Sequence, residues 1–88
     1  MKKLYFVKTN GYNMLVSVDD EYNCRYLTET EDFPYITNDE PEIQKEKALD
    51  FLETVEDDSG WEDDCSYDQI FEEFPDDIEI IAEIEKEL

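Results

Sequence analysis

The dipeptide Asn10-Gly11 constrains the fold most, because it separates two runs of apolar and aromatic residues. Asn-Gly between two such runs is a strong signal for a β-hairpin, since both residues accept the positive φ that primed turns need. Residues 3–8 are rich in the aromatic and β-branched residues that strands favour. Residues 12–18 form the return strand, in which every second residue gives one strongly apolar face: Met14, Val16 and Val18.

A turn at residues 19–23 leads to a third, shorter strand at residues 24–28. Three consecutive strands with tight links predict an antiparallel meander. Residues 29–40 then read as a loop, in which prolines break regular structure. We expect three apolar side chains to attach this loop to the core: Phe33, Tyr35 and Ile36.

Residues 42–56 have the pattern of a helix. Asp39 followed by Glu42 has the spacing of a helix start, with Pro41 in the first turn. The expected buried face holds Ala48, Phe51 or Leu52, and Val55, extended less regularly by Ile43, while acids line the outer face: Glu46, Asp50, Glu53 and Asp57. Ser59-Gly60 is the expected C-cap.

A second, short helix is expected over residues 66–74. Ser66 would be its N-cap, Pro75 would end it, and its buried side would hold Tyr67, Ile70, Phe71 and Phe74. Residues 77–88 fit two structures. Isoleucine density favours a strand, whereas the Glu-Lys-Glu-Leu ending and a three-residue apolar step favour a helix, which is the prediction we adopt.

These elements predict a single domain, residues 1–88, of the α+β class. The expected architecture is a three-stranded antiparallel meander with two to three helices packed on one face, the last segment being a helix or a fourth strand. The aromatic content of 14% supports a folded core, since disordered acidic chains are poorer in aromatics.

The negative charge is concentrated in one part of the chain. The formal net charge is −20, yet residues 1–25 carry four cations against three acids, and residues 26–88 carry three cations against 24 acids. Solubility needs a net charge of only about 2–8 in a small domain. Charge of this size disfavours direct contact with nucleic acid or anionic membranes and favours a basic protein partner.

The residue types do not suggest catalysis or a cofactor. Histidine is absent, which excludes Ser-His-Asp and Cys-His sites, and two glycines cannot form a phosphate-binding loop. Aligning Gly60 with the invariant glycine of a calcium-binding EF-hand loop puts Val55 and Ser66 where acids are required, so we expect no specific metal site. Cys24 and Cys65 show no CxxC spacing, and no signal or membrane-spanning run is present. We therefore expect a non-enzymatic, cytoplasmic protein with reduced thiols.

The most acidic stretch is residues 55–64, where six of ten residues are acids and the chain's one tryptophan, Trp61, sits among them. We interpret the stretch as a turn between two helices with no basic residue nearby in sequence. Trp61 either caps the core or anchors a partner. The candidate partner-binding residues are Glu56, Asp57, Asp58, Trp61, Glu62, Asp63, Asp64, Asp68, Glu72 and Glu73.

Acids three or four residues apart on a helix lie about 5–6 Å apart, close to the separation of phosphates along one DNA strand. Such rows could occupy a basic DNA-binding channel. If they do, the acids of the second half should form one continuous face.

The stretch GWEDDCSYDQIFEEF, residues 60–74, together with a preceding meander and helix, resembles the small acidic anti-CRISPR proteins of phages and mobile elements. Some of these inhibit RNA-guided nucleases by imitating DNA. The resemblance implies an inhibitor acting in a bacterial cytoplasm, whose acids face the arginines and lysines that read duplex DNA in a CRISPR-Cas effector. Another DNA-binding protein would fit equally. The alternative is a small bacterial accessory domain that binds some other basic protein surface.

Overall fold

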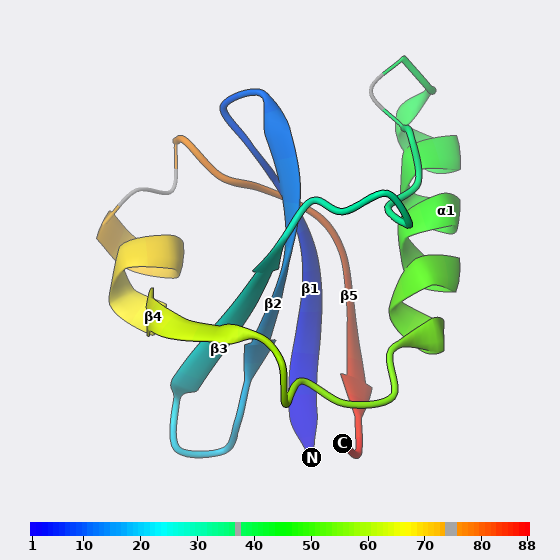
Figure 1. The fold of residues 1–88 in the computed structure, drawn as a ribbon. Helices are drawn as coiled ribbons and strands as arrows, with labels where there is room; N and C mark the ends of the chain where they lie inside the picture. The colour runs from blue at the N-terminus through cyan, green and yellow to red at the C-terminus, as the bar shows by residue number, and fades with distance from the viewer. Residues whose placement is uncertain (37, 74–75) are drawn as a thin grey trace.

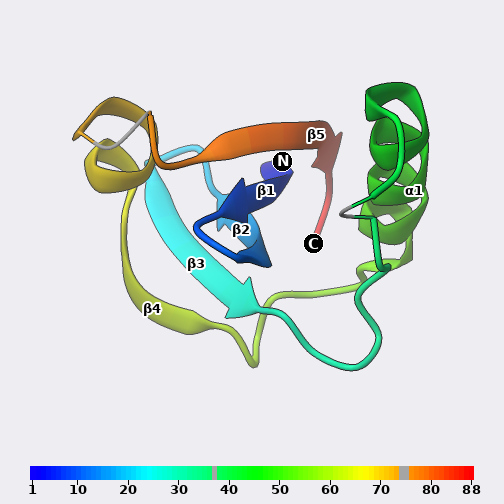
Figure 2. The same cartoon turned by 90° about the horizontal axis from the view of Figure 1, so that it is seen from above.

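The computed structural model describes residues 1–36, 38–73 and 76–88, and within residues 64–66 it describes the backbone alone. The elements are β1 (Lys2–Thr9), β2 (Tyr12–Val18), β3 (Asn23–Thr28), α1 (Pro41–Thr54), β4 (Glu62–Ser66), η1 (Gln69–Glu73) and β5 (Glu79–Lys86). The α+β class is therefore confirmed, but the sheet has five antiparallel strands in the order β4-β3-β2-β1-β5 rather than three. It lies between α1 and η1 (Figures 1 and 2).

The first hairpin forms where it was predicted, with a different turn. Thr9 pairs with Tyr12, so Asn10 and Gly11 make a two-residue link. Gly11 has a φ of 89°, but among the described residues other than glycine only Tyr22 has a positive φ. A primed turn needs a positive φ at its first central residue, so the expectation of a primed turn at Asn10 is wrong.

The expectation that residues 77–88 form a helix is also wrong. β5 pairs along β1, which places the first and last strands side by side (Figure 1). The register shifts by one residue where Phe6 pairs with Ala82 and Val7 with Ile80. Ile81 is therefore the extra residue of a β-bulge, which changes the faces to which its neighbours point. The ladder along β1 outweighs the helix propensity of the sequence, because it pairs backbone groups that an edge would leave open.

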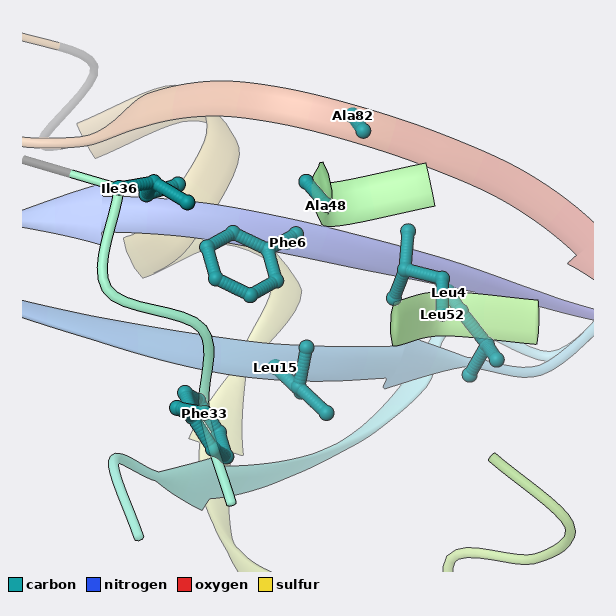
Figure 3. Packing of buried hydrophobic residues seen from close by; sticks show 8 residues of the cluster. All are labelled: Leu4, Phe6, Leu15, Phe33, Ile36, Ala48, Leu52 and Ala82. Carbon is teal, nitrogen blue, oxygen red and sulfur yellow. The ribbon is translucent and has the colours of Figure 1, made fainter. Parts of the chain in front are cut away.

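Two apolar clusters form, one on each face of the sheet. The first joins the strands to α1 and to the loop before it: Leu4, Phe6, Leu15, Phe33, Ile36, Ala48, Leu52 and Ala82 (Figure 3). The second lies on the opposite face under η1: Tyr5, Val7, Met14, Val16, Val18, Cys24 and Ile70. The prediction that the helices pack on one face is wrong, because the central strands are apolar on both sides.

α1 ends earlier than expected, at Thr54. Its N-cap is Glu40 rather than Asp39, and Asp39 instead pairs with Lys47 at 2.7 Å. Ala48 and Leu52 are buried as predicted, whereas Ile43 is exposed. In the preceding loop Phe33 and Ile36 are buried, but Tyr35 is 73% exposed and does not attach the loop to the core.

The second predicted helix is only partly present. Tyr67 and Asp68 begin a helical turn that continues as the five-residue π-helix η1. Ser66 is the last residue of β4 and directly precedes this turn, and its expected role as an N-cap rests on a side chain outside the described part of the structure. The expectations for Phe74 and Pro75 fall outside the described residues.

Candidate acidic interface

The acidic stretch at residues 55–64 is an extended connection followed by an edge strand. The expected C-cap at Ser59-Gly60 is wrong, because α1 has already ended: the Val55 N–H bonds to the Leu52 carbonyl at 3.2 Å. The expected turn between two helices is wrong as well, since Glu62 begins β4, which pairs with β3. The stretch therefore crosses from α1 to the far edge of the sheet (Figure 1).

Asp58 is buried within the fold, with 5% of its surface exposed. Lys2 Nζ donates hydrogen bonds to both of its carboxylate oxygens, at 3.0 and 2.9 Å, and Ser17 Oγ donates another at 2.7 Å. Arg25 lies 3.7 Å from the same carboxylate and also donates to the Asp58 carbonyl at 3.4 Å. This carboxylate therefore ties the connection to the first three strands.

Opposing effects set the pKa of Asp58. Burial would raise the pKa, but hydrogen bonds from Lys2 and Ser17 and the charges of Lys2 and Arg25 outweigh it, so the pKa lies below its ordinary value. The folded protein therefore holds Asp58 as a carboxylate. Its role is internal, and a buried carboxylate with three partners does not belong to a surface that meets a partner.

Sequence reasoning missed the residues that hold Asp58, and it assumed that no basic group lies near the stretch. Lys2 and Ser17 are 56 and 41 positions away. Arg25 further binds Asp63 through Nε at 2.8 Å. One sequence signal was available. Four of the seven cations fall in the first 25 residues, so a lysine or arginine of the meander could form an ion pair with an acid from the rest of the chain.

The other predicted residues have different positions. Trp61 packs against the cluster beneath α1, which is the core-capping role. Glu56 and Asp57 are exposed on the connection. Hydrogen bonds from the Ser59 side chain and backbone lower the pKa of Asp57. The side chain of Asp64 lies outside the described part of the structure.

Exposed acids from β4 through η1 follow one another at the β4 side of the sheet. We call this surface the acidic edge and define it by Glu62, Asp63, Asp68, Glu72 and Glu73. Glu62 accepts a hydrogen bond from Tyr26 at 3.3 Å.

A hollow of about 700 Å³ adjoins the acidic edge. It is lined by Lys2, Asp19, Tyr22, Asn23, Cys24, Arg25, Asp58, Asp63, Tyr67 and Asp68. The rings of Tyr22 and Tyr67 meet edge to face in its wall, with centroids 5.1 Å apart. Tyr22 is 67% exposed, so the hollow offers an aromatic surface beside carboxylates.

The outer acids of α1 lie on the opposite side of the sheet from η1 (Figure 2). These acids, which we call the helix row, are Glu42, Glu46, Asp50 and Glu53, and all four are exposed. The expectation of one continuous acidic face is therefore wrong. The fold separates the acids of the second half into the helix row and the acidic edge.

Within residues 1–36, 38–73 and 76–88, no group of three or more metal-ligating side chains is placed to hold an ion. No helix in the described part of the chain is long and apolar enough to cross a membrane. Comparisons of the chain with protein families, with curated proteins and with solved structures found no match. Fold and site thus define a small α+β domain with an acidic sheet edge.

Proposed function

We propose that this protein is a non-enzymatic inhibitor that occupies the DNA-binding surface of a nucleic-acid-binding protein, such as a CRISPR-Cas effector. The contact is limited to the acidic edge, because the acids of the second half do not form the one continuous face expected of a mimic. The observation that carries the proposal is that five exposed acids gather there and, among the described residues, only Asp63 has a basic partner.

Three of the chain's own cations are held by groups outside the acidic edge, whereas Arg25 pairs with Asp63 of the edge itself. Lys2 is bound by Asp58, Lys47 by Asp39, and Lys86 by the carbonyls of Glu53 and Val55. The acidic edge is therefore left with a negative potential that a basic partner can neutralise. Such a potential speeds association with a basic surface and makes it sensitive to salt, as phosphate charge does for DNA.

The acidic edge is suited to contact a partner whose basic surface normally binds phosphates. Asp68 and Glu72 are four residues apart in the helical segment that includes η1, and both carboxylates are exposed. Arginines and lysines that bind phosphates also bind carboxylates, so the exposed acids of the edge can take the place of phosphates on such a surface.

The tyrosine pair adds a contact that charge alone does not give. Tyr22 and Tyr67 line the hollow together with Asp63 and Asp68. A guanidinium at the hollow would be attracted by the tyrosine rings and by Asp63 and Asp68, and it would have to compete with Lys2 and Arg25, which also line the hollow. Tyrosine is also enriched among the residues that dominate binding energy at interfaces.

The test is a competition experiment. A Cas effector loaded with its guide, and separately a restriction enzyme, is bound to labelled duplex DNA, and the full chain is added over a series of salt concentrations. We expect displacement of DNA from at least one of them at low salt, weakening as salt rises. Two double variants with the same charge change locate the contact: Asp68→Lys with Glu72→Lys on the acidic edge, and Glu46→Lys with Asp50→Lys on the helix row.

Reversal at the edge should weaken displacement about tenfold or more, since it replaces two attractions by repulsions, and reversal on the helix row should weaken it far less. Circular dichroism establishes that both variants fold. Equal losses in the two variants would mean that only total charge matters and would contradict a defined contact. Binding to basic proteins without displacement of DNA would favour the accessory-domain alternative.

A further inference from the structure

The chain's two cysteines lie directly opposite each other in the sheet. Cys24 of β3 and Cys65 of β4 are Cα partners in the antiparallel ladder, although 41 positions separate them in sequence. The pairing is unlike anything that the sequence pattern suggested, because residues 62–66 carry three acids and did not read as a strand.

Opposed positions in an antiparallel pair suit a disulfide. Directly opposite residues have Cα atoms about 4.5–5.5 Å apart, and their Cβ atoms stand on the same face of the sheet. Disulfides span Cα separations of about 4.4–6.8 Å. Residues paired in this register are therefore within the range of Cα separations that a disulfide spans.

The Cys24 half of the pair borders a hollow that is open to solvent. Cys24 is 6% exposed and belongs to the apolar cluster under η1, yet it also lines the hollow beside Asp63 and Tyr67. A small reagent entering the hollow would approach β3 at this point.

We infer that Cys24 and Cys65 form a redox-active pair that is oxidised to a cross-strand disulfide by a small-molecule disulfide such as oxidised glutathione. One thiolate attacks the small disulfide, which releases one small thiol and leaves a mixed disulfide on the protein. The second thiolate then attacks the mixed disulfide and releases the second small thiol. Overall, two protein thiols lose two electrons and two protons, and the reagent gains them as two thiols.

The disulfide would attach the short edge strand β4 covalently to β3. β4 is five residues long, and its register with β3 shifts between Cys24 and Tyr26. Oxidation would tether this strand covalently and fix the position of Glu62 and Asp63 against β3. The inference does not depend on the proposed function, because it concerns the stability of β4 whether or not a partner binds there.

The experiment equilibrates the full chain with mixtures of reduced and oxidised glutathione, quenches with acid, and counts products by intact mass and peptide mapping. We expect an intramolecular Cys24–Cys65 disulfide as the main product. Repeating the equilibration in urea measures how far the fold favours the disulfide. We expect the ratio of disulfide-bonded to reduced chain to be about tenfold or more higher in the folded protein than in urea.

The single variants Cys65→Ser and Cys24→Ala serve as controls, and circular dichroism reports their folding. Each should give only a glutathione adduct. If the folded wild-type chain also yields only adducts, dimers or unreacted thiols, or if urea does not lower the ratio, the inference is overturned. The wild-type measurement needs no variant, so it stands even if Cys24→Ala fails to fold.

Discussion

Replacing Asp58 with asparagine tests whether the buried carboxylate organises the meander. The variant keeps the shape of the side chain but removes the charge that faces Lys2 and Arg25. Removing one partner of a fully buried ion pair costs about 3–5 kcal/mol. The side chains of Lys2 and Arg25 are 28% and 40% exposed, so water can partly replace the lost carboxylate. We therefore expect a loss of about 2–3 kcal/mol in the free energy of unfolding.

Urea denaturation followed by circular dichroism measures this loss, and thermal unfolding should show a fall of about 10–20 °C, given the size of the domain. Glu56→Gln is the matched control, since it removes one negative charge from the same connection at an exposed position. The control should keep wild-type stability. A difference below about 0.5 kcal/mol between the two variants would refute the role given to Asp58.

The difference in stability between wild type and Asp58→Asn should depend on pH. Because the folded pKa of Asp58 is lowered, its contribution is complete above the unfolded value of about 3.9 and disappears as the pH falls through the folded value. The stability gap between wild type and Asp58→Asn should therefore be constant from neutral pH to about pH 5 and close below about pH 4. A gap that persists in acid would show that packing, not charge, holds this carboxyl group.

Two further predictions concern the whole surface and the core. Added monovalent salt should raise the melting temperature by on the order of 5 °C up to about 0.5 M, because it screens repulsion among the exposed acids; a flat or falling curve would mean that these acids are compensated. Leu52→Ala should lower the free energy of unfolding by about 2–5 kcal/mol in urea denaturation, since Leu52 of α1 is fully buried against the sheet. Ile43→Ala on the same helix should lower it by less than about 1 kcal/mol, because Ile43 is 42% exposed; similar costs would contradict the packing of α1.

The first half of the fold could be predicted because its signals are local. β1, β2, β3 and α1 follow from alternation, turn residues and helical periodicity within short windows. β4 and β5 are different, because each gains its structure from a strand far away in sequence. Aspartate is depleted in strands, so residues 62–66 form β4 only through pairing with β3.

The sequence predicts which acids belong to the candidate site, but it does not predict how the fold arranges them. That acids between Glu62 and Glu73 would lie at the surface follows from their charge. That Asp58 would be buried does not, since only the folded sheet brings Lys2, Ser17 and Arg25 to one point. The bulge at Ile81 likewise changes which isoleucines point inward, and no local pattern marks it.

The positions of the acids show that protection of the sheet edges explains only part of their abundance. Both edge strands carry exposed acids, including Glu62 and Asp63 on β4 and Glu83 and Glu85 on β5, and charge there prevents a sheet edge from pairing with another chain. That role accounts for the strands alone. It does not account for Glu72 and Glu73 on η1, which has no open ladder to protect, nor for the helix row on α1. This remaining charge destabilises the compact state by self-repulsion, and contact with a basic partner would relieve that cost for the acids it covers.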